Sequence, residues 1–414
     1  MTTTPPTGLR AMRDHVGLAY FPISALARLP ISMLGLGSLT YAVASADQFA
    51  TAGTVSAFAG LGVALGAPLS GAASDRWGQR VTLLVATVAH ALALLGLLAV
   101  IAPTATPLTL TPIVAGAALL AGATAPQCGP MTRVRWIRRL AGRDPHTLET
   151  AQGYESTVDE LGFVFGPASV GIVAVLAGPA APLWASLVLT LLMVPAFALH
   201  RSSAFAAGHR DGRHGAAGET APTPWGAIAL LLLGMLSIGT VFGSLATTTT
   251  VFVEETGHAD IGGVIYAAMG LTSGAAALSV SRWPTSWSAG RRWVSCATAL
   301  LPALALLWLA AEPWHLGLLL LLVGAPIGPV LVTVFHAAGT CTPARRLGLV
   351  MTLLSAGITL GTSLGNWLGG ALADAGGHRA SLWVTFGAGG FVLAFGLLFA
   401  LRSRGRSERG GRLA

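Results

Sequence analysis

The chain has 414 residues, of which 53% are hydrophobic and 10% charged, and its formal net charge is +8. Its mean hydropathy is +0.70, and most of the sequence falls into apolar runs of about 20 residues, the length that crosses a bilayer. All 24 basic residues are Arg, so the chain has no phosphate-loop lysine and no Schiff-base lysine. These features indicate a polytopic membrane protein. They argue against a soluble domain and against an ATP-driven pump encoded in this chain alone.

The apolar runs predict about twelve membrane-spanning helices. In chain order we expect them near residues 25–46, 55–71, 81–101, 112–131, 158–177, 183–199, 226–246, 262–280, 294–310, 316–335, 347–371 and 382–401.

The arginines predict the orientation of these helices. With an even number of spans and a cytoplasmic N-terminus, Arg28 falls within the first span, Arg379 falls outside and the other arginines fall inside, as the positive-inside rule requires. We therefore expect a multi-pass protein of the cell membrane with both termini in the cytoplasm. The pI of about 10.6 is explained by this orientation, and we expect no nucleic-acid partner.

The sequence repeats itself at a spacing of 199 residues. Gly129-Pro130 recurs as Gly328-Pro329, so the fourth expected span matches the tenth. The fifth matches the eleventh through three glycine pairs, which are Gly162 with Gly361, Gly166 with Gly365, and Gly171 with Gly370. A parallel repeat of two six-helix halves is a design that secondary transporters use. We expect bundles at residues 1–200 and 224–401, joined by a cytoplasmic linker at 201–223 and followed by a cytoplasmic tail at 402–414.

A charged turn between the second and third spans also has a copy. Gly78-Gln79-Arg80 returns as Gly290-Arg291-Arg292 at a spacing of 212 residues, with Trp287 at the position of Asp75. The second copy therefore lacks the acid, and we interpret it as degraded.

Two motifs resemble a known family. The turn's Gly71, Asp75, Arg76, Gly78 and Arg80 resemble motif A of the major facilitator superfamily. The resemblance covers essentially the whole chain. It implies an all-α polytopic membrane fold of twelve transmembrane helices, in two six-helix bundles related by pseudo-two-fold symmetry, and a transporter rather than an enzyme.

The fifth expected span resembles that family's motif C, which is associated with its exporters. The match consists of Gly162, Gly166, Pro167 and Gly171. Gly166-Pro167 predicts a bend, and the pair Gly162 and Gly166 would let another helix pack at backbone distance. Structural packing alone explains the same residues about as well.

Asp75 is expected to act as a latch. Its carboxylate can accept hydrogen bonds from the N-terminus of a neighbouring helix and pair with Arg76 or Arg80. The family resemblance implies that this neighbour is the eleventh span, near Leu347. The alternative is an ordinary charged loop that obeys the positive-inside rule.

An acidic cluster opens the fifth expected span. Glu155, Asp159 and Glu160 are the proton-coupling candidates, because a carboxylate in the membrane is costly until it is protonated or paired. Arg28 and Arg133 are expected at similar depth as ion-pair partners. An ion-pair network that only fixes helix positions is an equally good interpretation.

Polar side chains in otherwise apolar spans are the candidates for a substrate cavity. They are Tyr41, Gln127, Thr240, Tyr266, Thr333, Thr359 and Asn366.

The leading hypothesis is a proton-coupled exporter of a small amphipathic or drug-like molecule that works by alternating access. We expect it to need no cofactor, to draw on the proton gradient, to have the small-molecule substrate, protons and the lipid bilayer as its partners, and to function as a monomer. A proton-coupled importer of a sugar, organic acid or peptide is the alternative, although the chain has a single Asn for such contacts. A membrane enzyme or a non-transporting receptor is the third hypothesis. The sequence shows no metal-ligand cluster and no catalytic constellation that would support it.

Overall fold

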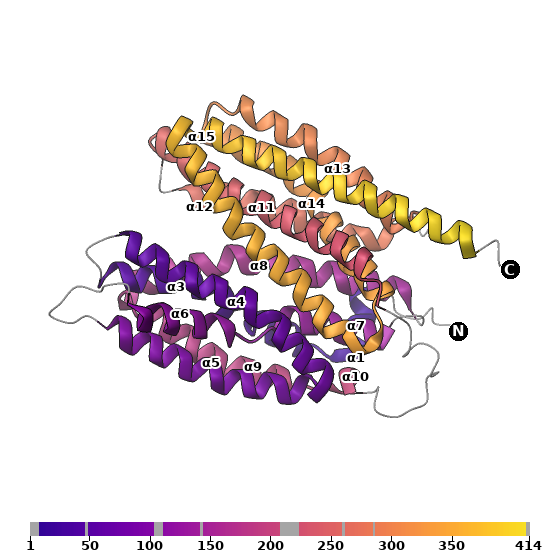
Figure 1. Cartoon of the computed structure of the whole chain (residues 1–414), viewed down its shortest axis with the longest axis horizontal. Helices are drawn as coiled ribbons and strands as arrows, with labels where there is room; N and C mark the ends of the chain where they lie inside the picture. The colour runs from indigo at the N-terminus through magenta and orange to yellow at the C-terminus, as the bar shows by residue number, and fades with distance from the viewer. Residues whose placement is uncertain are drawn as a thin grey trace. The chain divides into compact units, whose positions relative to one another are not determined.

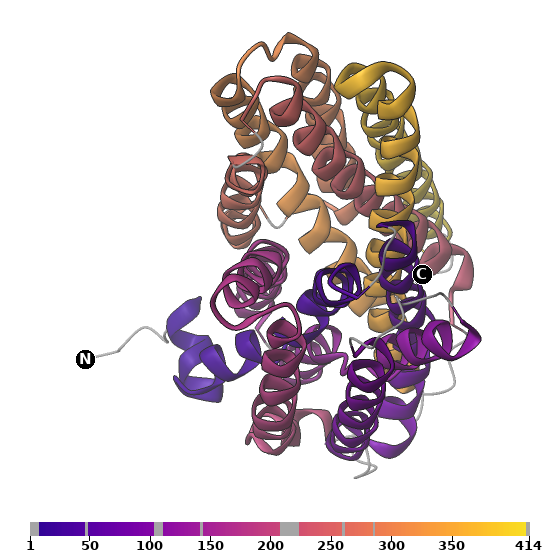
Figure 2. The same cartoon turned by 90° about the vertical axis from the view of Figure 1, so that its left-hand side faces the viewer.

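The computed structural model describes residues 8–45, 49–102, 111–140, 144–207, 223–258, 261–284 and 286–410. These residues form helices joined by short turns, as both views of the chain show (Figures 1 and 2). The first half contains α1 Leu9–Val16, α2 Tyr20–Leu26, α3 Leu29–Val43, α4 Phe49–Trp77, α5 Gln79–Ile101, α6 Pro112–Ala123, α7 Cys128–Leu140, α8 Pro145–Ala177, α9 Ala181–Leu199 and α10 Ser203–Ala207. The second half contains α11 Trp225–Glu255, α12 Gly262–Ser279, α13 Ala289–Leu306, α14 Pro313–Cys341 and α15 Leu347–Gly410, with short 3-10 turns at Val280–Arg282, Leu307–Leu309 and Ala344–Arg346.

Within the described residues, nine helical segments are long and apolar enough to cross a membrane. The last of them contains both final expected spans. Two glycines divide α15, because Gly376 has non-helical dihedral angles and Gly377 has a φ of +67°, a conformation that favours glycine.

The fourth expected span is not one continuous helix. It is divided between α6 and α7, with non-helical residues at 124–127. Pro126 lies in this break, and a proline disfavours helical geometry at the residue before it and cannot donate a backbone hydrogen bond. The prediction of an unbroken helix over 112–131 is therefore wrong. Two further helices were not predicted: α1, which buries Met12 and Val16, and the short α10 at the start of the expected linker.

The contacts divide the chain into two compact units. Unit 1 contains Met1–Ala141, Leu161–Thr220 and Pro343–Ala356, and unit 2 contains Gly142–Glu160, Ala221–Thr342 and Gly357–Ala414. Two helices therefore contribute to both units. The first part of α8 belongs to unit 2 and the rest to unit 1, whereas the first part of α15 belongs to unit 1 and the rest to unit 2.

Close helix pairs organise each unit. In unit 1, a Cβ at Gly66 of α4 would collide with the carbonyl oxygen of Ala123 at the end of α6. In unit 2, a Cβ at Gly328 of α14 would collide with the carbonyl oxygen of Ser273 on α12. Small residues permit this backbone approach in membrane helices. Around the first pair, Leu94 of α5 is completely buried in an aliphatic core.

Candidate functional site: two charged contacts at helix ends

The first charged contact is in unit 1, where α4 ends beside the start of α15. Gly71 and Gly348 face each other there: a Cβ at Gly71 would lie 2.6 Å from Gly348 O, and a Cβ at Gly348 would lie 2.9 Å from Gly71 O. Any larger side chain at either position would push the two backbones apart. The two glycines therefore bring the next turn of α4 within hydrogen-bonding distance of the first amides of α15.

Asp75 occupies that next turn. Its Oδ1 accepts a hydrogen bond from Gly348 N at 2.9 Å, and its Oδ2 accepts one from Leu349 N at 2.9 Å. The first N–H groups of a helix have no partner within the helix and carry partial positive charge, so a carboxylate here is stabilised by both effects. The expected contact of Asp75 with the start of the eleventh span is present in the structure. Its role as a latch stays a prediction.

The ion-pair partner of Asp75 is Arg138 of α7, and the expectation of Arg76 or Arg80 is wrong. Arg138 Nη2 lies 3.2 Å from Asp75 Oδ1, and both side chains are buried. Arg76 and Arg80 are exposed, because α4 ends at Trp77 and Gly78, with a φ of +88°, turns the chain into α5.

Arg138 joins three segments of unit 1. It donates to Asp75, to the carbonyl oxygen of Ala206 at 2.7 Å and to that of Ala344 at 3.1 Å. Burial lowers the pKa of the Arg138 guanidinium, and the charge of Asp75 opposes this effect. We call the set of Asp75, Arg138, Gly348 and Leu349 the Asp75 contact.

A second arginine of α7 supports the same turn. Arg135 Nε donates to Gln79 Oε1 at 3.0 Å, and Gln79 Nε2 donates to Met131 O at 3.1 Å. Arg135 Nη1 also donates to Phe197 O and to Ser202 Oγ. The sequence analysis did not predict roles for Arg135, Arg138 and Gln79, and it used Arg135 and Arg138 only to predict orientation. The spacing of Arg135 and Arg138, three residues apart on one helix, was the available signal.

The second charged contact is in unit 2. Arg292, at the beginning of α13, donates from Nη1 to Glu149 Oε1 of α8 at 2.7 Å, and from Nη2 to Pro284 O at 3.3 Å. The side chains of Arg292 and Glu149 are 7% and 13% exposed. His336 of α14 lies close enough to interact electrostatically with both. From the sequence we interpreted the turn at Gly290-Arg291-Arg292 as degraded. In the structure this turn does form an ion pair that is largely buried. We call this pair the Glu149 contact.

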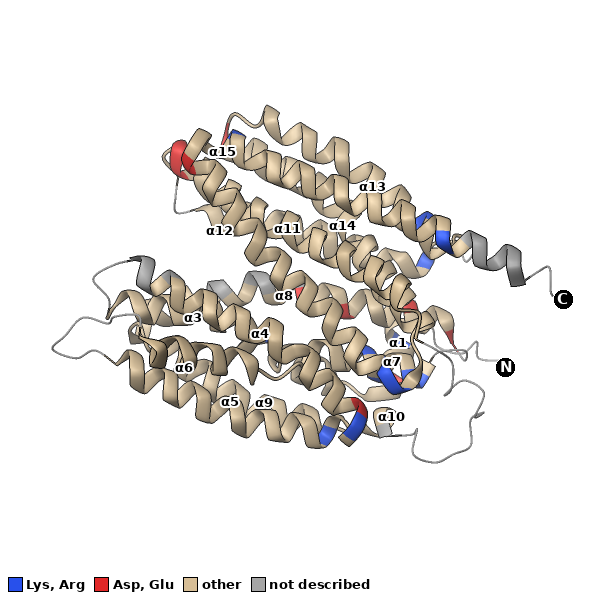
Figure 3. Cartoon of the chain, in the orientation of Figure 1, with Lys and Arg blue, Asp and Glu red and all other residues tan. Residues whose placement is uncertain are grey.

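Most charged residues gather at helix ends, whereas the middles of α5, α9 and α11 are free of charge (Figure 3). A family model of the Major Facilitator Superfamily matches residues 16–340, which is most of the chain. The chain belongs to the Major Facilitator Superfamily. It is therefore a multi-pass membrane transporter, and members of this family are typically not enzymes.

Solved structures of superfamily proteins share this fold at low sequence identity. The human organic anion transporter MFSD10 (TETRAN) is 16% identical, with 92% of this chain and 99% of that one covered and a TM-score of 0.66. A bacterial homologue of the iron transporter ferroportin is 14% identical, with 92% and 99% covered and a TM-score of 0.68. The proton:xylose symporter XylE is 15% identical, with 94% and 95% covered and a TM-score of 0.62. No curated protein matches the sequence. The predicted fold class is confirmed.

Helix α8 carries the residues that resemble the superfamily's motif C. A Cβ at Gly166 would lie 3.1 Å from Ser32 C and still closer to the Ser32 side chain, so α8 and α3 approach at backbone distance there. Gly162 and Gly171 have no described atom within 4 Å of such a Cβ. The expected close packing is therefore present at Gly166, whereas no described residue provides it at Gly162. The side chain of Pro167 lies outside the described residues.

The acidic cluster lies on the first part of α8. Glu155 is completely buried and Asp159 partly buried, while the side chain of Glu160 lies outside the described residues. Arg28 and Arg133, both buried, belong to unit 1. Arg28 Nη2 donates to Thr132 Oγ1 at 2.6 Å. The expected pairing of these arginines with the acidic cluster stays a prediction.

The cavity candidates have different surroundings. Tyr41 does not fit the expectation, because it is buried in the aliphatic core and its hydroxyl donates to Leu98 O at 3.3 Å. Gln127 is also buried and bonds locally to Ala125 O. Both side chains are therefore buried within unit 1.

The remaining candidates are in unit 2. Thr240 lies where α11 crosses α15 and donates to Leu236 O within its own helix. Tyr266 donates to Phe242 O at 3.2 Å. Asn366 is exposed and accepts from Thr247 Oγ1 at 3.3 Å, and Thr359 is partly buried. Thr333 Oγ1 is buried and has no hydrogen-bond partner in the described part of the chain. Among the described residues, no group of three or more His, Cys, Asp or Glu side chains could hold a metal ion.

Proposed function

We propose that this transporter is a proton-coupled exporter of small amphipathic or drug-like molecules. The observation that carries the proposal is the complete burial of Glu155 in α8, the helix that also contains the motif C resemblance. A buried carboxylate that is alternately protonated and ionised can couple proton movement to a change of state. Asp159 lies about one helical turn further along on the same side of α8.

The polar groups of unit 2 favour a substrate without strong charge. Thr240, Tyr266 and Thr359 are neutral, and the long helix α11 has no charged residue before its final Glu254-Glu255. A substrate cavity lined by neutral side chains of this kind selects a ligand by shape and a few hydrogen bonds. The structurally similar proteins are described as an organic anion transporter, a bacterial homologue of an iron transporter and a proton:xylose symporter. These substrates share no chemistry, so the fold alone does not suggest one for this chain.

The two helix-end contacts supply an element that can open and close. The Asp75 contact holds the start of α15 in unit 1, and the Glu149 contact holds the start of α8 in unit 2, while each helix continues into the other unit. Releasing either contact frees the start of a helix that both units share. We propose that the contacts break and re-form during alternating access, with the termini in the cytoplasm and the protein acting as a monomer.

Proton coupling and direction can be tested together in proteoliposomes that contain a trapped pH dye. Ligands are first found by thermal shift of the purified protein with a compound library at two pH values, since a ligand of the folded state stabilises it by mass action. With an acidic lumen and the compound outside, an exporter that exchanges substrate for protons accumulates the compound and its lumen becomes alkaline. Accumulation that instead requires an acidic exterior identifies a symporter and overturns the proposal.

Three variants assign the coupling residue. We expect Glu155→Gln or Asp159→Asn to abolish proton movement while downhill exchange of the compound continues, and Glu160→Gln is tested in the same way. Glu254→Gln, at the far end of α11, is the matched control. If all three cluster variants keep a wild-type ratio of protons to substrate, coupling does not depend on this cluster.

A further inference from the structure

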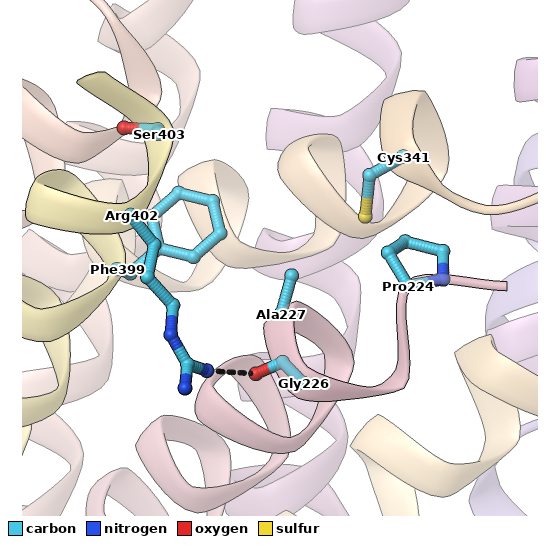
Figure 4. Close-up of a pocket in the computed structure, with 7 residues that line it drawn as sticks. All are labelled: Pro224, Gly226, Ala227, Cys341, Phe399, Arg402 and Ser403. Atoms are coloured by element: carbon cyan, nitrogen blue, oxygen red, sulfur yellow. Dashed lines mark hydrogen bonds between the residues drawn. The ribbon is translucent and has the colours of Figure 1, made fainter. Parts of the chain in front are cut away.

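A cavity of about 470 Å³ lies in unit 2, where α11 begins and where α14 and α15 end. Its lining consists of Pro224, Gly226, Ala227, Cys341, Phe399, Arg402 and Ser403. Figure 4 shows the Phe399 ring and the Arg402 side chain on one side, and Ala227 and Pro224 on the other. The walls are therefore apolar apart from one guanidinium, one hydroxyl and one thiol.

Among the described residues, Arg402 is the only charged one that lines the cavity. Its Nη1 donates to Gly226 O at 2.9 Å, as the dashed line in Figure 4 marks. The other N–H groups of an arginine remain in the same plane and suit two oxygens of a phosphate. The Ser403 hydroxyl can donate to a third oxygen by turning away from Ala400 O, which it contacts at 2.8 Å.

The residues around the cavity place it at the boundary between lipid and water. Leu398, one helical turn before Arg402, is 48% exposed, and Trp225, beside Gly226, is 45% exposed. Exposed Leu on a membrane helix faces acyl chains, and Trp is enriched at the level of the headgroups. Residues 402–414 contain five Arg and one Glu, so the sequence that follows the cavity is positively charged.

We propose that this cavity binds the headgroup of an anionic glycerophospholipid. The phosphate contacts Arg402 and Ser403, the glycerol backbone fills the apolar space against Phe399 and Ala227, and the acyl chains continue along Leu398. Basic pockets between transmembrane helices on the cytoplasmic side recognise such headgroups. A bound lipid would tie the ends of α11 and α15 together, which Arg402 and Gly226 do with a single hydrogen bond.

Native mass spectrometry of the purified full-length protein tests this site, with phosphatidylglycerol as the probe and phosphatidylcholine as the neutral reference. We expect phosphatidylglycerol to bind at least about fivefold more tightly. Arg402→Gln should remove this preference, because the charge is lost. Ala227→Phe should weaken phosphatidylglycerol binding while the charge is kept, because the new ring fills the cavity. Arg291→Gln is the matched control, since Arg291 is exposed and does not line the cavity.

Three outcomes would overturn the proposal. The first is an Arg402→Gln variant that keeps the full preference, and the second is an Arg291→Gln variant that loses it equally. The third is competition by glycerol 3-phosphate at the same concentration as the lipid, which would show a site for a soluble phosphate. Thermal unfolding of each variant without added lipid confirms that the folded protein is being compared.

Discussion

The Asp75 contact and the Glu149 contact lie at corresponding places in the two halves, but their chemistry is reversed. In the first, the turn between two helices supplies the acid, and the start of α15 supplies backbone N–H groups. In the second, the start of α8 supplies the acid, and the turn supplies Arg292. One contact uses the polarity of a helix end and the other an ion pair between side chains. The comparison shows that a duplicated fold can keep a contact while exchanging the groups that make it.

The spacing of the repeats identifies the residues that correspond in the two contacts. Gly348 lies 199 residues after Glu149, and Trp283 lies 212 residues after Gly71. In the first half, two glycines let the backbones meet, so a short Asp side chain reaches the amides. In the second half, Trp283 and Glu149 occupy the corresponding positions. Helices α8 and α12 still approach at backbone distance one turn further along, where a Cβ at Gly153 would lie 2.6 Å from Ala277 O. The charged contact itself is made by the side chains of Glu149 and Arg292.

The largest expected effect is that of Asp75→Asn. The amide keeps the shape but loses the charge, so Arg138 is left buried without its acid, and one of two backbone N–H groups loses its acceptor. Removing one partner of a buried pair costs about 3 to 5 kcal/mol. We expect transport to fall at least about tenfold, the thermal midpoint to fall, and hydrogen exchange at Gly348 and Leu349 to accelerate.

The matched control for Asp75→Asn is Arg76→Gln. Arg76 belongs to the same motif but is exposed and lies over the Trp77 ring at 5.7 Å. We expect its transport rate to stay within about twofold of wild type, because exposed charges contribute little. An Arg76→Gln variant as damaged as Asp75→Asn would show that the motif acts through its net charge.

The second prediction concerns the Glu149 contact. Glu149→Arg and Arg292→Glu should each impair transport and lower stability, because each places two like charges together. The double variant should recover, and the coupling energy between the positions should fall in the range of about 0.5 to 3 kcal/mol. No equivalent charge swap exists for the Asp75 contact, because two of the partners of Asp75 are backbone N–H groups, which a substitution cannot turn into acceptors. If the double variant is worse than either single one, the ion pair is not what these positions contribute.

The third prediction separates close approach from charge. In Gly71→Ala, the new methyl group would lie 2.6 Å from Gly348 O, so α15 must move away from Asp75. Overpacking of this kind costs about 1 to 3 kcal/mol. Gly96→Ala in α5 is the control, because a Cβ there has no described atom within 4 Å. We expect the thermal midpoint to fall for Gly71→Ala and to stay or rise for Gly96→Ala.

Most of the fold followed from the sequence because long apolar runs can satisfy their backbone groups in a membrane only as helices. The predicted helix boundaries were wrong where local backbone geometry or polarity determines them. Pro126 breaks the fourth expected span, and α1 is too polar for a hydropathy pattern to reveal. The crossing of α8 and α15 between the units depends on contacts between distant residues, which no local pattern specifies.

Part of the candidate site could also be predicted from the sequence. The motif resemblance identified Asp75. A carboxylate in a turn between two membrane helices needs a hydrogen-bond donor or a cation, so its contact with a helix N-terminus could be predicted. The choice of Arg138 over Arg76 and Arg80 depends on the direction in which α7 runs past the turn, and sequence proximity favoured the wrong arginines. Glu149 was not predicted because it lies before the expected fifth span, whereas the predicted acids Glu155, Asp159 and Glu160 lie at its start. The pairing of Glu149 with Arg292 joins residues 143 positions apart.

The smallest expected effect is that of Trp287→Ala, at the position that corresponds to Asp75. Trp287 packs edge to face against Trp283 at 5.7 Å, and an aromatic pair of this geometry contributes about 0.5 to 1.5 kcal/mol beyond its buried area. The Glu149 contact does not include either ring, so transport should change by less than about twofold while the thermal midpoint falls slightly. A tenfold loss of transport would mean that the indole holds Arg292 in place, and the second half would then depend on the same turn position as the first.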